Sequence, residues 1–221
     1  MSDVQFHWNR RFSFDPDQKY LVYFRGCFCP CHKNHLAQIE PYYDVPNVNI
    51  FISQMGSEHR HGVPARVNRK IWKSYIKHCV PAECRQRIRL EQMQDGAADI
   101  KPHLDGIHRV LYVMGNEKEH LMEHGNPGPD QIRRLKKARR KREHHLRQQR
   151  ERLVRILAKR HIGLDFVIDD RVMKGKVSAT QFVAAIRRGA TVEELSTFMP
   201  DALPLKQRQK IISRLRKCRL H

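Results

Sequence analysis

The chain has 221 residues, of which 40% are hydrophobic, which is enough to bury the core of one domain of ordinary size. No apolar run approaches the roughly 18 residues of a membrane span, and residues 1–19 are too polar for a signal peptide. We therefore expect an intracellular protein, cytoplasmic, nuclear or carried in a virion, with no membrane partner and six reduced cysteines. Its net charge of +20 favours an anionic partner.

Strand and helix patterns alternate along the chain. Four short runs of β-favouring residues are predicted to be strands: residues 20–24, 47–53, 108–114 and 164–168, of which the first and third are expected to be buried. Between the strands we expect a short helix over 32–40, an amphipathic helix opened by Pro64, and a further helix from Pro81 to about Met93. This alternation predicts an α/β fold, a Rossmann-like parallel sheet with helices on both faces.

The Gly- and Pro-rich turn at 125–129 marks a boundary. We expect residues 1–125 to form the N-terminal part of the α/β domain, 126–161 a long basic helical insertion, and 162–221 the C-terminal part with terminal basic helices. Ser178 and Thr191 are each expected to cap a helix, and residues 205–217 to form a last amphipathic, basic helix.

The insertion concentrates positive charge. Residues 130–160 contain fourteen Lys or Arg against three acids, more than half of the net charge. Such a density predicts binding of DNA, RNA or another polyanion, through phosphates rather than by stacking because no aromatic residue interrupts the run. A solvated helix or a coiled-coil arm is the alternative. The candidate polyanion-binding residues are Arg133, Arg134, Lys136, Lys137, Arg139, Arg140, Lys141 and Arg142.

A phosphate-binding pattern follows the first predicted strand. The sequence there is Gly26-Cys27-Phe28-Cys29-Pro30-Cys31-His32-Lys33-Asn34-His35. A helix start attracts anions through its free N–H groups and dipole, and the two imidazoles can add hydrogen bonds. Gly26 would let the backbone approach a nucleotide, and Pro30 would stiffen the turn.

This segment resembles the signature Gly-x-Phe-x-Pro-x-His-x-Gly-His of the HxGH nucleotidyltransferases, the superfamily of adenylyl- and cytidylyltransferases. Gly26, Phe28, Pro30, His32 and His35 are in register with it. Asn34 replaces the glycine, and we interpret it as the residue next most tolerant of a left-handed backbone. The resemblance covers about residues 20–115 and 162–200, and is that of a divergent member, such as a viral or phage one.

A second motif of that superfamily, Ile-Ser-Ser-Thr-x-x-Arg, is similar to Val177-Ser178-Ala179-Thr180-Gln181-Phe182-Val183. Ser178 and Thr180 match, whereas Val183 stands in place of the arginine; Arg187 or Arg188 would have to substitute for it. By this resemblance the nucleotide-binding residues are Gly26, Phe28, Ser178, Thr180 and Arg187.

The resemblance implies transfer of a nucleoside monophosphate from ATP or CTP to a phosphate-bearing acceptor, with Mg²⁺ and release of pyrophosphate. His32 and His35 would contact the phosphates, and Lys33 would add a cation. The alternative is a catalytically degenerate fold that binds nucleic acid or serves in assembly, for example of a virion. The sequence leaves open whether the protein is an enzyme, as it does the acceptor, the base and the oligomeric state.

A zinc site is the alternative reading of Cys27, Cys29, Cys31, His32 and His35. Zinc ligands usually come as pairs two to four residues apart on two loops, so a Cys-x-Cys-x-Cys run in a tight turn makes a poor tetrahedral site. We therefore predict no metal bound by these side chains.

Overall fold

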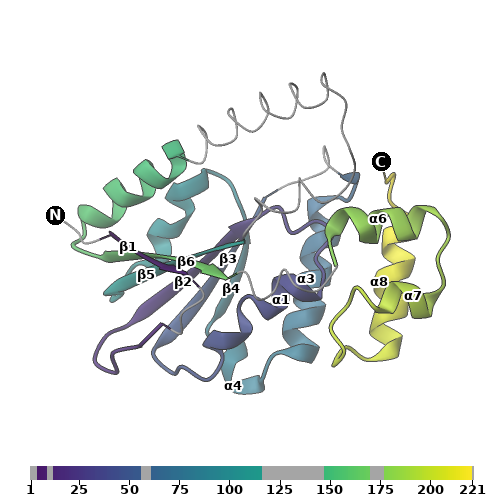
Figure 1. Cartoon of the computed structure of the whole chain (residues 1–221), viewed down its shortest axis with the longest axis horizontal. Coiled ribbons are helices and arrows are strands. Elements are labelled where there is room, and N and C mark those ends of the chain that lie inside the picture. Colours follow the sequence, from purple (N-terminus) through teal and green to yellow (C-terminus); the bar gives the residue numbers. More distant parts are fainter. Residues whose placement is uncertain (1–3, 9–11, 56–60, 116–146, 170–176, 221) are drawn as a thin grey trace.

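The computed structural model describes residues 4–8, 12–55, 61–115, 147–169 and 177–220. Its centre is a parallel sheet of six strands in the order β1-β6-β5-β2-β3-β4, with helices on both sides (Figure 1). This confirms the Rossmann-like α/β fold. The strands are β1 (Val4–Trp8), β2 (Tyr20–Gly26), β3 (Val48–Gln54), β4 (Ile88–Gln92), β5 (Arg109–Gly115) and β6 (Gly163–Asp169).

The central strands are buried on both faces, which is why their sequences are almost continuously apolar. Successive side chains of β2 point to opposite faces of the sheet: Val22 and Phe24 join one core cluster, and Leu21 and Tyr23 join the other. The sheet therefore separates two hydrophobic cores, each closed by its own helices.

The first core lies under most of the helices. They are α1 (Lys33–Ala37), η1 (Glu40–Tyr42), α3 (Ala65–Cys79), α4 (Ala82–Arg85), α6 (Ala179–Arg187), α7 (Val192–Ser196) and α8 (Leu205–Arg216). The predicted caps are confirmed: the Ser178 hydroxyl accepts from the Gln181 N–H and the Thr191 hydroxyl from the Glu194 N–H, each at 3.2 Å.

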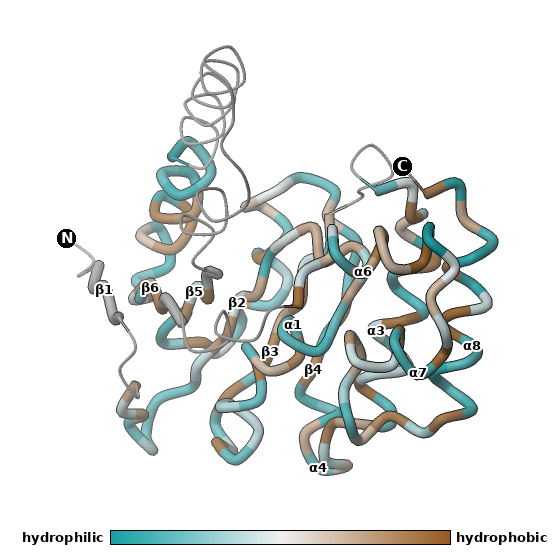
Figure 2. The backbone as a smooth tube through the Cα atoms, turned by 45° about the vertical axis from the view of Figure 1, so that its right-hand side comes forward, coloured by the Kyte–Doolittle hydropathy of each residue, from teal (hydrophilic) through white to brown (hydrophobic). Residues whose placement is uncertain are grey.

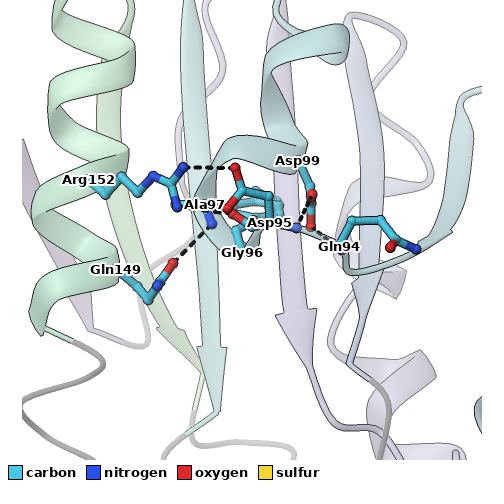
Figure 3. Close-up of polar contacts among 8 residues, drawn as sticks. Gln94, Asp95, Gly96, Ala97, Asp99, Gln149 and Arg152 are labelled. Atoms are coloured by element: carbon cyan, nitrogen blue, oxygen red, sulfur yellow. Dashed lines mark hydrogen bonds and ion pairs between the residues drawn. The ribbon is translucent and has the colours of Figure 1, made fainter.

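The second core is covered by η2 (Gly96–His103) and by a helix over residues 147–158. Polar contacts join these two elements (Figure 3). The Gln149 side chain accepts a hydrogen bond from the Ala97 N–H at 3.0 Å, and Arg152 forms a two-point ion pair with Asp95. Gly96 has φ +59°, a left-handed backbone conformation that favours glycine.

The two edge strands depart from the predictions. The helix predicted from Pro81 to about Met93 is wrong: α4 has only four residues, and residues 88–92 form β4, paired with β3. Its sequence, Ile-Arg-Leu-Glu-Gln, contains good helix formers, but sheet pairing overrides that propensity. Strand β1 was not predicted at all.

Most of the predicted insertion, including the eight candidate residues between 133 and 142, lies outside the described residues. The described part of the basic segment is helical over 147–158. Among the described residues no helix is both long and apolar enough to cross a bilayer.

Candidate functional site

The candidate site lies at the carboxyl edge of the sheet, where β2 and β5 are neighbours. The chain leaves β2 toward α1, whose Leu36 belongs to the first core. After β5 the next described helix, 147–158, contributes Leu153 and Leu157 to the second core. Adjacent parallel strands whose connections go to opposite faces leave a crevice beyond their carboxyl ends, the usual ligand position in open α/β sheets.

Gly26 and Phe28 pack against each other at the end of β2. Phe28 has φ +41°, is buried, and stacks on Phe24 with ring centroids 4.3 Å apart. A Cβ added to Gly26 would lie 2.7 Å from the Phe28 ring, so the glycine makes room for that ring. This packing explains why glycine and phenylalanine stand at these two positions, and their contact with a nucleotide stays a prediction.

The turn that carries the cysteines is fastened to α3. The Asn68 side chain accepts from the Cys31 N–H at 2.8 Å, and the Tyr75 hydroxyl donates to the Cys31 carbonyl at 3.2 Å. The Cys29–Pro30 peptide is cis. Burial raises the pKa of the Cys31 thiol well above its usual value. In the part of the chain that the structure describes, no group of three or more His, Cys, Asp or Glu side chains could hold a metal ion.

The two histidines stack on each other at the start of α1. Their ring centroids are 3.7 Å apart, with 29° between the planes. The backbone N–H of His32 donates to the His35 Nδ1 at 3.2 Å, so the proton of neutral His35 is on Nε2. Burial, and secondarily the neighbouring His32, holds the pKa of His35 well below its ordinary 6.5. At neutral pH His35 is therefore an uncharged hydrogen-bond donor.

Side-chain and backbone contacts bring α1 next to the C-terminal motif. The Asn34 side chain donates to the Val177 carbonyl at 3.0 Å, and the Lys33 N–H donates to the Phe198 carbonyl at 2.9 Å. The histidine pair and the Ser178 helix start, more than 140 residues apart in sequence, therefore lie side by side.

The same contacts change two expectations. Asn34 lies inside α1 and has no positive φ, so its interpretation as a left-handed residue is wrong; it links two segments instead. The backbone N–H of Lys33 donates its hydrogen bond to the Phe198 carbonyl, so this N–H at the helix start does not serve as a free donor to an anion.

The residues of the second motif differ in their surroundings. Ser178 is the N-cap of α6, with its hydroxyl oxygen accepting from Gln181, and Thr180 is exposed. Val183, in the position of the superfamily's arginine, is buried and only 4% exposed. Arg187 is exposed in the last turn of α6.

Sequence reasoning missed Asn68, Tyr75 and Phe198, which hold the two motifs in place. Asn68 could have been found from the sequence. It lies between apolar residues on the buried face of an amphipathic helix, where a polar side chain needs a hydrogen-bond partner.

An open hollow of about 530 Å³ lies away from the histidine pair, beside the helix over 147–158. It is lined by Arg147, Arg150, Glu151, Val154, Arg155 and Phe166.

Comparisons with known proteins give structural likeness only. No protein-family model matches the chain, and no curated protein matches it in sequence. Solved structures do: a nicotinic acid mononucleotide adenylyltransferase of Plasmodium falciparum complexed with NaAD is 9% identical, covers 88% of this chain and 98% of its own, and has a TM-score of 0.49.

Two further structures are similar. A putative nicotinate-nucleotide adenylyltransferase of Vibrio parahaemolyticus is 12% identical, with 90% of this chain and 96% of that chain covered and a TM-score of 0.48. Thermotoga maritima TmcAL, bound with alpha-thio ATP, is 14% identical, with 89% of this chain and 57% of that chain covered and a TM-score of 0.48. All three scores lie below 0.5, so the chemistry of the site rests on its own geometry.

Proposed function

We propose that this protein binds a nucleoside triphosphate between the histidine pair and the start of α6, and transfers its nucleoside monophosphate to a phosphate-bearing acceptor. The observation that carries the proposal is the direct link between the two motifs, the Asn34–Val177 hydrogen bond at the carboxyl edge of the sheet. This hydrogen bond supports the proposal because it joins the residue beside His35 to the residue beside Ser178.

In the proposed reaction an oxygen of the acceptor phosphate attacks the α-phosphorus. The bond from that phosphorus to the bridging oxygen of the β-phosphate breaks, and pyrophosphate leaves with the bonding electrons. Such a step needs positioning and charge stabilisation rather than a covalent enzyme group. His35 donates from Nε2 to the phosphates as a neutral group, with His32 beside it, and Lys33 supplies positive charge. Ser178 and Thr180, at the start of α6, hold the β- and γ-phosphates. Arg187 lies in the last turn of α6, about 13 Å farther along the helix axis, and is left out of the proposed contacts.

Mg²⁺ would reach this site with the triphosphate. The described residues hold no group of three or more metal-binding side chains, and Mg²⁺ commonly binds through phosphates and water with few protein ligands. When bound, it would neutralise charge on the leaving pyrophosphate.

Substitutions of Ser178 test the binding site without removing the helix cap. Ser178→Asp keeps an oxygen that can accept from Gln181, but places a negative charge where the phosphates would sit. We expect it to abolish ATP or CTP binding at an unchanged melting temperature, whereas Ser178→Thr retains binding. Equal nucleotide affinity in both variants would contradict the proposal.

Turnover is measured separately, as pyrophosphate release with Mg²⁺, a panel of nucleoside triphosphates and phosphate-bearing acceptors. His32→Ala is expected to lower the rate at least 100-fold, the scale of one charge-stabilising donor. His78→Ala removes a histidine of α3 outside the site, and serves as the matched control.

A second candidate is a degenerate nucleotidyltransferase fold that binds nucleic acid through residues 130–160 or serves in assembly. Buried Val183 and the occupied Lys33 N–H favour it, because both remove a phosphate contact that the resemblance implies. Nucleic-acid binding that persists in His32→Ala and falls steeply with salt, without turnover of any nucleotide, would establish this candidate over the first.

A further inference from the structure

Helix α3 carries a continuous basic stripe. Its five Lys and Arg residues are all exposed, and it contains no Asp or Glu. They follow one another at helical spacing along the side opposite the buried Ile71, Trp72 and Tyr75. The stripe consists of Arg66, Arg69, Lys70, Lys73 and Lys77. It spans about 16 Å at 1.5 Å per residue.

Helix α8 has the same character. It also carries five Lys and Arg residues and no acid, with Ile211, Ile212 and Leu215 buried. Its exposed lysines, Lys206 and Lys210, continue in the C-cap residue Lys217. Among the described residues none of these three lysines, and none of the five basic side chains of α3, forms an ion pair.

The two helices pack against each other and run in opposite directions. Arg208 near the start of α8 lies close to Cys79 at the end of α3, where it opposes the burial that raises the pKa of that thiol to about 11. Arg66 at the start of α3 likewise opposes the burial that raises the pKa of Cys218, just beyond α8. Figures 1 and 2 place both helices on the side of the molecule away from the helix over 147–158.

We propose that the exposed basic residues of α3 and α8, the α3/α8 surface, bind the phosphate backbone of a nucleic acid. The two packed helices each carry a row of exposed cations, contain no acid, and form no ion pair through these residues within the described part of the chain, so they complement a polyphosphate. Exposed aromatic residues, which bases stack on, are missing from both helices, so binding is independent of sequence. The only large hydrophobic side chain exposed among the described residues is Leu205, which leaves little to insert into a lipid surface.

This surface is distinct from residues 130–160 and independent of the nucleotidyl-transfer proposal. Three double variants with the same change in net charge test it in the full chain. Lys73→Gln with Lys210→Gln alters the α3/α8 surface. Lys19→Gln with Lys101→Gln is the matched control, because both lysines are exposed, one in the loop before β2 and the other in η2. Arg155→Gln with Lys159→Gln alters the described part of the basic segment. Glutamine is a good helix former, so the folds should be retained, as circular dichroism would check.

Binding to duplex DNA and to duplex RNA is measured over a series of salt concentrations. The α3/α8 variant is expected to flatten the plot of log affinity against log salt by about two units, since each phosphate contact contributes roughly 0.9. The control is expected to keep the wild-type slope. Loss in both the DNA and RNA series supports recognition of the shared backbone, and loss in one series assigns the surface to that nucleic acid.

Three outcomes would overturn the proposal. The first is that the protein binds neither duplex. The second is that the α3/α8 and control variants lose duplex affinity equally, and the third is that only the Arg155/Lys159 variant loses it. Vesicles containing phosphatidylserine provide a fourth arm. Vesicle binding that depends on Lys73 and Lys210 while duplex binding does not would assign the surface to an anionic membrane instead.

Discussion

At the scale of single residues, the histidine pair makes the stability of the fold depend on pH. The pKa of His35 is depressed in the folded protein and ordinary, near 6.5, when the chain unfolds. Below about pH 6.5 the unfolded chain therefore takes up a proton that folded His35 does not, and the free energy of unfolding falls. Above that pH the full contribution of His35 is present.

We expect His35→Asn to weaken this dependence, because the Asn Oδ1 can accept the hydrogen bond from the His32 N–H without titrating. Between pH 7 and 5.5 the wild type should lose more unfolding free energy than the variant, by up to about 1.4 kcal/mol per pH unit. Urea unfolding at several pH values measures this difference. Identical pH profiles of the wild type and the variant would show that the pKa of His35 is not lowered in the folded protein.

Gly26 provides a second test at this scale. Gly26→Ala places a Cβ against the Phe28 ring and is expected to cost about 1–3 kcal/mol of unfolding free energy. The same substitution in a Phe28→Leu background should cost less, because the ring that it collides with is gone. A double-mutant cycle from denaturant unfolding measures the coupling, and additive costs would contradict the packing explanation.

At the scale of elements, the sequence predicted the four inner strands and missed the two at the edges. Strands β2, β3, β5 and β6 lie inside the sheet, and each contains a run of at least three consecutive apolar residues that marks it as a strand. Strand β1, Val-Gln-Phe-His-Trp, alternates apolar and polar residues over its whole length, and β4, Ile-Arg-Leu-Glu-Gln, over its first four residues. Such alternating runs are too short to decide between strand and helix when pairing with a distant strand determines the outcome.

The contact between η2 and the helix over 147–158 was likewise unpredictable, because it joins residues more than 50 positions apart in the sequence. Gln149→Ala removes the acceptor for the Ala97 N–H and should loosen the attachment of this helix. We expect faster hydrogen exchange of the amides of residues 153–157. Arg155→Ala, an exposed change on the same helix, should leave their exchange rates unchanged; equal acceleration in both variants would exclude a specific role for Gln149.

At the scale of the whole molecule, the sequence located the charge only in part. Residues 130–160 dominate any linear count, whereas the cations of α3 and α8 are separated by well over 100 residues and stand on neighbouring helices only after folding. The candidate site likewise depends on contacts between residues that are distant in the sequence. Its motifs could be recognised in the sequence, but their adjacency depends on contacts made by Asn34 and Phe198, which no local pattern predicts.

The link from Asn34 also restricts which residue can stand at this position. A glycine at that position would match the superfamily signature better, yet it would have no amide to reach the Val177 carbonyl. Asn34 therefore ties α1 to the segment that leads into α6, so this one side chain fixes the position of a helix start more than 140 residues away.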